Sequence, residues 1–328
     1  MASGAHRDCF PDASASNNYS VNLNKNPPIS PSNLCFLAEV KMTYASILAP
    51  LSDAKVGSSA MDAALLIAKK FSAHLDVLHV TTDPRQIIPY VGEGLSGSLV
   101  DEVVSAAATD SGKRQLAAQE LFDSKTKSSG VSIVEIPSAG LSVAWREDNG
   151  RDDERAAVWA RTADLAVAPR PQANAEAATT AMFEALVFEG GLPVVLAPPQ
   201  TPTSVGERIL IGWNGGAECA RAIASAMPFL ETASAVEIVS MPGWLDGVAS
   251  LKKVQDRLAW RNISSECKEL PGDSPIEIGQ SLLNAADNFG ADLIVMGAYT
   301  QSRIRQMILG GVTRHAVSNA QCCLFLER

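Results

Sequence analysis

The chain has 328 residues, of which 46% are hydrophobic, and it carries a formal net charge of −9 at pH 7. This length predicts two domains, and the acidic balance argues against a protein that binds nucleic-acid polymers, because phosphate-backbone binding needs a basic face. No apolar run is long enough to cross a membrane and the six cysteines lack metal-site spacing, so we expect a cytoplasmic protein with reduced, mostly buried thiols.

Residues 1–41 differ in composition from the rest of the chain. They are rich in Ser, Asn and Pro and lack the apolar h-region of a signal peptide. We therefore expect a disordered tail, or a product of an upstream start, since Met42 stands just before the first strong strand. We assign no function to this segment.

From about residue 44 onward, apolar strands alternate with helical stretches, which is typical of a parallel sheet built from βαβ units. In the first half we expect strands at 46–51, 75–80, 131–136 with 141–145, 164–168 and 193–197. The helices expected between them span 58–71, 99–124, 153–161 and 176–188.

The same order restarts at Arg208. Strands are expected at 209–213, 236–241, 265–270 and 292–296, with helices at 218–230, 245–260 and 275–289. A basic amphipathic helix, the pair Gly310-Gly311, a second helix and a last apolar strand complete this half.

Two stretches make the repeat concrete, because 162–167 (TADLAV) aligns with 290–295 (GADLIV). The first copy is the longer one, which places an insertion near 83–130. We expect the insertion to form a lid or partner surface, or else a long amphipathic helix that completes the first domain. The Pro-rich linker 198–206 separates domains at 42–199 and 207–328. Such copies usually pack as an intramolecular pseudo-dimer, which leaves further homodimerisation open.

The segment after the strand at 292–296 is locally basic. Between Tyr299 and His315 its charged residues are Arg303, Arg305 and Arg314, with no Asp or Glu. Glycines at helix N-termini after a strand favour phosphates, because free N–H groups and the helix dipole attract anions. The segment therefore indicates an anionic ligand, although Arg303 and Arg305 could equally form the solvated face of a helix.

The strand at 292–296 is followed by Gly297, Thr300, residues 301–309, the pair Gly310-Gly311 and then 312–315 (VTRH). This series resembles the glycine motif of the universal stress protein (UspA-like) family. The whole chain resembles its tandem two-domain members. The resemblance implies an α/β fold of two Rossmann-like, adenine nucleotide alpha hydrolase-like domains, each a mostly parallel five-stranded sheet with flanking helices. It also implies a regulatory role in the stress response, with ATP or another adenine nucleotide as ligand.

The resemblance also implies the site residues. The candidate nucleotide-binding residues are Trp213, Asn214, Gly215, Met241, Gly297, Thr300, Gly310, Gly311, Val312, Thr313 and Arg314. Three of them depart from the family motif, since Asn214 replaces an acidic residue, Thr300 a glycine and Gly311 a Ser or Thr. Trp213 could stack on an adenine or simply belong to the core.

The first copy departs further from the motif. Its fourth strand is followed by Ala168–Pro171 (APRP), which has no glycine and contains two prolines without N–H donors. Asp53 is an offset match to the acidic residue at the end of strand one. We expect this copy to have lost the nucleotide site and to serve packing or partner binding.

No catalytic constellation stands out in the sequence. The four histidines are scattered, and the terminal loop has no Asp or Glu to hold Mg²⁺, so we predict neither catalytic residues nor a metal. A regulatory binding protein is favoured over an enzyme. A ligand-free scaffold of the same fold is the alternative, and a weak nucleotide hydrolase or transferase is the least favoured interpretation.

Overall fold

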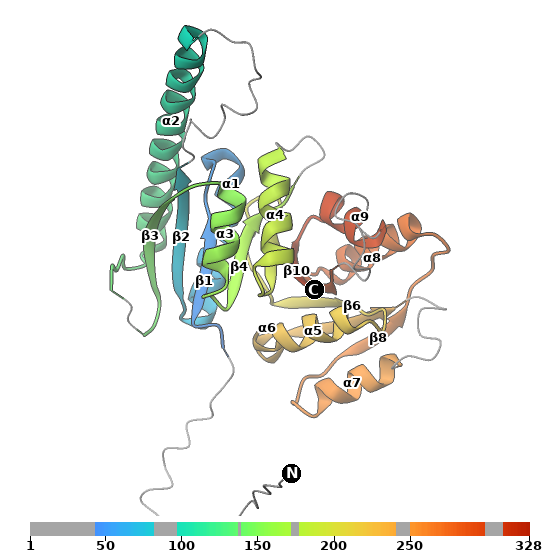
Figure 1. Ribbon diagram of the computed structural model, residues 1–328. Helices are drawn as coiled ribbons and strands as arrows, with labels where there is room; N and C mark the ends of the chain where they lie inside the picture. Colours follow the sequence, from blue (N-terminus) through green and yellow to red (C-terminus); the bar gives the residue numbers. More distant parts are fainter. Residues whose placement is uncertain (1–42, 82–96, 137–138, 172–176, 241–249, 299–310) are drawn as a thin grey trace, which may run out of the picture. The chain divides into compact units, whose positions relative to one another are not determined.

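The computed structural model describes residues 43–81, 97–136, 139–171, 177–240, 250–298 and 311–328 (Figure 1). The chain divides into two compact units, Met1–Lys41 and Met42–Arg328. All described elements belong to the second unit. The expected tail at 1–41 therefore lies outside the described residues, as do Met241, Thr300 and Gly310.

One sheet organises the described residues of Met42–Arg328. Its ten described strands are β1 (Ser46–Pro50), β2 (His74–Thr81), β3 (Ser142–Asn149), β4 (Leu165–Pro169), β5 (Val194–Ala197), β6 (Arg208–Gly212), β7 (Ala235–Ser240), β8 (Glu266–Glu269), β9 (Leu293–Gly297) and β10 (Cys323–Glu327). The helices are α1 (Ala54–Phe71), α2 (Gly97–Ser129), α3 (Asp152–Ala160), α4 (Ala177–Glu189), α5 (Ala217–Ser225), α6 (Met227–Thr232), α7 (Leu251–Ala259), α8 (Pro275–Phe289) and α9 (Gly311–Asn319).

The strand order is β3-β2-β1-β4-β5-β10-β9-β6-β7-β8. Neighbouring strands run parallel within each half, whereas β5 and β10 pair antiparallel, with Phe325 opposite Val195. Read from one edge, the first five strands are β3-β2-β1-β4-β5, and read from the other edge they are β8-β7-β6-β9-β10. Equivalent strands of the two copies therefore occupy equivalent places, as a pseudo-two-fold axis requires. The predicted α/β fold with a mostly parallel sheet is confirmed.

Both faces of this sheet are buried, which explains why the strands read as continuous apolar runs rather than alternating ones. One core cluster joins strand residues to α1, α2, α5, α6 and α7. The other joins the opposite strand faces to α3, α4, α8 and α9. Each cluster contains residues of both halves, so the two copies share their cores.

Four aromatic rings connect the copies on the first of these faces. Phe229 of α6 packs against Tyr44, Phe71 and Phe325, with ring centroids 5.5, 4.8 and 6.1 Å away respectively. The Tyr44 hydroxyl also donates to the Ser225 carbonyl oxygen at 2.5 Å. Stacked and edge-on aromatic contacts of this kind add to the free energy of burial.

The aspartates of the aligned repeat segments perform the same task in both copies. The Oδ2 atom of Asp164 accepts the backbone N–H of Ser46 at 2.9 Å. The Oδ1 atom of Asp292 accepts the N–H groups of Glu207 and Arg208, each at 3.0 Å. Each carboxylate thus holds the start of the neighbouring strand, which gives the sequence repeat a physical reason.

Several element boundaries differ from the prediction. Helix α1 begins at Ala54 instead of 58, because the Asp53 side chain accepts the N–H groups of Lys55 and Val56 at 2.7 and 3.1 Å and caps the helix there. The single helix expected over 218–230 is divided into α5 and α6. Pro228 lacks the N–H that would continue α5, so the helix restarts at Met227.

The insertion in the first copy is largely a helix. Helix α2 has 33 residues, whereas its counterpart α7 has 9 described residues. Figure 1 shows one end of α2 extending beyond the strands. The strand expected at 131–136 contributes only an isolated bridge from Ile133 to Val143. Among the described residues, no helix is long and apolar enough to cross a membrane.

Candidate functional site

In the second half, β7 and β8 lie on one side of β6, and β9 and β10 lie on the other. In the first half, β2 and β3 lie on one side of β1, and β4 and β5 lie on the other. The strand order therefore reverses at β6 and at β1. Strand β6 lies between β7 and β9, and Gly212 at its end pairs with Met296 of β9. In open α/β sheets ligands bind outside the carboxyl ends of the strands at such a switch point. The equivalent point in the first half lies between β1 and β4.

The loop after β6 is a tight turn into α5. Trp213 is 5% exposed, and its backbone N–H donates to the Val239 carbonyl oxygen at 2.8 Å. The side-chain oxygen of Asn214 accepts the Gly216 N–H at 2.8 Å, and Gly215 has φ 77°, in the left-handed region that favours glycine. Trp213 therefore belongs to the core, whereas Asn214 shapes the turn at the switch point.

Gly297 and Gly311 are both glycines that close packing requires. A Cβ on Gly297 would lie 2.6 Å from the backbone nitrogen of Cys219 in the first turn of α5. A Cβ on Gly311 would clash with the Cβ of Pro275 at the start of α8. These two motif positions thus have a packing reason of their own, whatever they contribute to a ligand.

The first turns of α9 present side chains in different directions. Thr313 is buried, Val312 packs against the core, and Arg314 is exposed. His315 packs against Gly279 of α8, and its Nε2 atom lies 3.3 Å from Oε1 of Gln280. Arg314 is therefore the described residue of this turn that is free to meet an anion, while His315 packs between the two helices.

The structure brings the predicted site residues at the ends of β6 and β9 together, whereas those of the last helix lie on a separate element. Trp213, Asn214 and Gly215 lie at the end of β6, and Gly297 meets the same α5 turn from the neighbouring β9. Residues 311–314 lie on α9, which packs on α8.

The sequence did not single out Cys219, which lies between these strand ends. Its thiol is 4% exposed and donates to the Gly212 carbonyl oxygen at 3.4 Å. Burial raises the pKa of this thiol. Cys219 is therefore a neutral packing residue beneath the candidate site.

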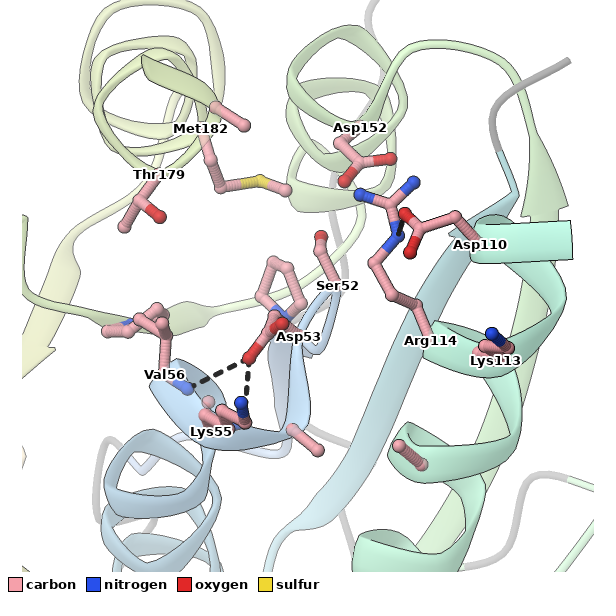
Figure 2. A pocket seen from close by; sticks show the side chains of 16 residues that line it. Ser52, Asp53, Lys55, Val56, Asp110, Lys113, Arg114, Asp152, Thr179 and Met182 are labelled. Atoms are coloured by element: carbon pink, nitrogen blue, oxygen red, sulfur yellow. Dashed lines mark hydrogen bonds and ion pairs between the residues drawn. The ribbon is translucent and has the colours of Figure 1, made fainter. Parts of the chain in front are cut away.

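A cavity of about 380 Å³ lies at the equivalent switch point of the first half (Figure 2). Its lining combines the ends of β1 and β4 with the start of α1, the middle of α2, the start of α3 and α4. The lining residues are Pro50, Ser52, Asp53, Ala54, Lys55, Val56, Gly57, Asp110, Lys113, Arg114, Ala117, Asp152, Pro169, Ala178, Thr179 and Met182.

This cavity was not foreseen from the sequence. We expected the first copy to serve packing or partner binding because its loop lacks the motif glycines. The side chains of α2 and α4 instead enclose a space next to that loop, and Figure 2 shows Thr179 and Met182 of α4 pointing into it. Two sequence signals bear on this site: Asp53, the offset match at the end of β1, and the insertion predicted near 83–130, which supplies α2.

The segment that replaces the glycine loop in the first copy makes a contact between the copies. Arg170 is 5% exposed, and its Nη1 group donates to the Ala320 carbonyl oxygen just after α9. Burial lowers the pKa of this guanidinium. A cation at the C-terminal end of a helix is favourably placed, so the contact agrees with a packing role for this segment.

Within the described ranges, no group of three or more His, Cys, Asp or Glu side chains could hold a metal ion. Among the described site residues of the second half, the polar side chains that are not buried are the amide of Asn214 and the guanidinium of Arg314. Such groups hold a ligand by hydrogen bonds and charge.

Comparison with known proteins agrees with this fold. Residues 276–326, from the start of α8 into β10, match the sequence model of the universal stress protein family. The structure of a universal stress protein from Archaeoglobus fulgidus DSM 4304 superposes with a TM-score of 0.61 at 13% identity, over 86% of this chain and 98% of that chain. The predicted resemblance to the universal stress proteins is confirmed.

Two further structures have comparable coverage. A candidate universal stress protein from Pseudomonas aeruginosa UCBPP-PA14 gives a TM-score of 0.52 at 14% identity, over 87% of this chain and 93% of that one. A protein of unknown function from Pseudomonas aeruginosa PAO1 gives 0.50 at 15% identity, over 87% and 92%. No curated protein matches the sequence. At these identities the similarity establishes the fold.

Proposed function

We propose that this chain is a regulatory protein of the stress response that binds an adenine nucleotide at the carboxyl ends of β6 and β9. The proposal rests on the position of the universal stress protein family match within the chain. Residues 276–326 include the end of β9 and the start of α9, which flank the segment that the sequence marks as locally basic. A switch point of an α/β sheet is where such a ligand is expected.

The roles of the residues follow from their chemistry. Asn214 offers an amide to the ribose hydroxyls, and Arg314 is an exposed cation for the phosphates. The backbone N–H groups at the start of α9, from Gly311 onward, favour an anion together with the helix dipole. Thr300, Gly310 and Met241 complete the proposed site from the sequence pattern.

This set of groups suits binding better than catalysis. Hydrogen-bond donors and one positive charge hold a nucleotide, and its binding would shift the population of the conformation recognised by a partner. We propose on this ground that the second domain (207–328) senses the nucleotide and that the first (42–199) supports it.

Isothermal titration calorimetry with ATP tests the proposal. Wild-type protein is expected to bind ATP, and Arg314→Ala is expected to weaken binding about tenfold or more, because a charge-assisted hydrogen bond is lost. Arg257→Ala is the matched control. It removes an exposed arginine from the last turn of α7 and should leave the affinity unchanged.

A wild-type protein that gives no heat with millimolar ATP, ADP or AMP would overturn the proposal. The chain would then be a scaffold of the same fold without a ligand in this half. The packing roles of Gly297 and Gly311 favour that alternative.

A further inference from the structure

We propose that the outer side of α7 binds an acidic segment of a partner protein. The contact residues are Lys253, Arg257, Trp260 and Arg261, which we call the Trp260 patch. Helix α7 leads from the carboxyl end of β7 to the amino end of the parallel strand β8, so its last turn lies at the edge of the sheet opposite the proposed nucleotide site. The patch is therefore separate from that site and does not depend on it.

The Trp260 patch lies on the solvent side of a helix whose inner side belongs to the core. Leu251, Val254 and Leu258 form the inner side and are 9%, 4% and 0% exposed. The four patch residues are spaced i, i+4, i+7 and i+8, which places them together on the outer side. Trp260 is 89% exposed there. Its backbone N–H donates to the Asp256 carbonyl oxygen at 3.0 Å, so the indole stands on ordered backbone.

The equivalent helix of the first copy shows that the fold does not require a tryptophan at this position. Helices α2 and α7 each close with a left-handed residue, Gly130 at φ 68° and Asn262 at φ 60°, which is followed by a buried aliphatic residue. Aligning these two ends places the exposed Ser128 where the second copy has Trp260. The same helix end thus forms without an exposed indole.

The arginines of the patch also differ from their counterparts in the first copy. The same alignment places Lys125 at the position of Arg257, and Lys125 is held by Asp62, with Nζ and Oδ2 2.7 Å apart and side chains 24% and 16% exposed. Ser129 stands at the position of Arg261. The second copy has therefore gained two exposed arginines and an exposed tryptophan, none of which the helix end needs.

The carboxylates that meet the charged side chains of α7 already have partners. Asp256 lies 2.8 Å from Nζ of Lys252, and Glu231 at the end of α6 lies 2.7 Å from Nη1 of Arg261. Exposed pairs of this kind are weak and exchange readily for a partner's charge. They leave no carboxylate over for the rest of the patch.

Two cations of the patch remain without a counter-charge. Within the part of the chain that the structure describes, Lys253 and Arg257 form no ion pair, and both are exposed. The four cations of α7 and its cap face two carboxylates, which leaves an excess of two positive charges in a chain whose net charge is −9. The patch is thus a basic exception on an acidic protein, and it favours an acidic partner.

The charges of the neighbouring edge strand do not cancel this excess. The thiol of Cys267 meets the Leu251 carbonyl oxygen at 3.9 Å, so Cys267 faces α7. Side chains alternate along a strand, and Glu266 and Lys268 therefore point to the opposite face of the sheet. Glu269 shares the face of Cys267 but lies two residues further along β8, beyond the start of α7 and away from Trp260.

The composition of the patch describes its partner. Tryptophan and arginine are the residues that most often dominate binding energy at protein interfaces, and arginine pairs with carboxylates through two hydrogen bonds. Lys253 and Arg257 are one helical turn apart, so they suit carboxylates about 6 Å apart, with an apolar side chain beside them for Trp260. A bilayer suits the patch less well, because the apolar side of α7 is buried in the core and has nothing further to insert.

Fluorescence anisotropy with a fluorescein-labelled synthetic peptide tests the inference on the full chain. The peptide carries glutamates on both sides of a central phenylalanine, and a matched peptide has glutamine in place of each glutamate. Wild-type protein should bind the glutamate peptide about tenfold more tightly than the glutamine peptide at low salt. Added salt should reduce this preference, because the charges of the patch are exposed.

Substitutions in the patch and in the equivalent helix locate the binding. Trp260→Ser, which introduces the first copy's residue, should weaken binding of the glutamate peptide about tenfold. Lys253→Glu combined with Arg257→Glu should remove the preference for the glutamate peptide. Lys127→Glu, an exposed charge reversal in the last turn of α2, is the control and should leave binding unchanged. Every substituted side chain is exposed, so the variants should fold normally, and far-UV circular dichroism checks this.

Three results would each overturn the inference. In the first, neither peptide binds at about 1 mM, or the two bind alike. In the second, Lys127→Glu weakens binding as much as the patch substitutions do. In the third, vesicles of phosphatidylcholine with phosphatidylserine, or a single-stranded DNA oligonucleotide, bind through the patch more tightly than the glutamate peptide, which would make the ligand a lipid surface or a nucleic acid.

Discussion

Gly297 lies where β9 ends against the first turn of α5, and the space beside its Cα is filled by the backbone of Cys219 and by Glu218. The sequence indicated a glycine that leaves room for a phosphate. The structure adds that a neighbouring helix occupies one side of it. Close packing against α5 therefore requires a glycine at position 297, whether or not a ligand also binds there.

Gly297→Ala is therefore expected to destabilise the protein by about 1 to 3 kcal/mol, as overpacking does. The new methyl group would lie 2.6 Å from a backbone nitrogen, which can yield only if α5 shifts. Urea unfolding of both proteins measures the change in the free energy of unfolding.

Gly112→Ala provides the control for that measurement. Gly112 lies within α2 with nothing within 4 Å of an added Cβ, so this change should be neutral or stabilising by about 0.5 to 1 kcal/mol. Equal effects of the two substitutions would contradict the packing role of Gly297.

The described cysteines fall into different environments. Cys219, Cys267, Cys322 and Cys323 are free. Cys219 and Cys323 are buried as expected, whereas Cys267 is exposed on the edge strand β8. The sequence could not show this exposure, because it depends on β8 being at the edge of the sheet.

Iodoacetamide at pH 8 should modify Cys267 well before Cys322. Burial raises the pKa of the Cys322 thiol to about 12, so almost none of it is thiolate at that pH. Partial burial also raises the pKa of Cys267, so its labelling should accelerate between pH 8 and pH 9. Peptide mapping by mass spectrometry reads each site, and rapid labelling of Cys322 in the folded protein would contradict the assignment.

The ends of a helix could be predicted where residues at those ends mark them. The prediction for α8 over 275–289 was correct at both ends, because Ser274 caps its start, Pro275 occupies the first position and Gly290 ends it with φ 69°. Helix α1 was placed too late because its cap, Asp53, was read as a displaced motif residue. Pro228 is the sequence signal for the division between α5 and α6, and the expectation of one helix over 218–230 does not take it into account.

The sites depended on contacts that the sequence does not display. The β6-end turn could be predicted from its glycines, but the partners of Gly297 and Gly311 come from α5 and α8. The first-half cavity combines Asp53, Lys113 and Met182, which belong to three elements distant in the chain. Long-range juxtaposition of this kind follows from the topology and not from any local pattern.

At the scale of the molecule, the antiparallel pairing of β5 and β10 makes one sheet of two copies. Both core clusters cross this junction. Separating the copies would expose two strand edges and the aromatic contacts of Phe229. The halves are therefore related by repetition in sequence but joined by a common interior.

Urea unfolding of the full chain should accordingly show one transition. Tryptophan fluorescence and far-UV circular dichroism should give the same midpoint, because neither half can lose its core alone. Phe229→Ala should lower that midpoint by removing a buried aromatic contact between the copies. Two resolved transitions, or a Phe229→Ala variant that affects only one of them, would show that the halves unfold independently.

A crystal structure of the chain grown with ATP is the direct test of whether the second half binds an adenine nucleotide at its switch point. We expect nucleotide density at the carboxyl ends of β6 and β9, with the ribose near Asn214 and the phosphates near the start of α9 and Arg314. Density for ATP in the first-half cavity, or none at the β6 and β9 ends in protein that calorimetry shows to be saturated, would contradict it.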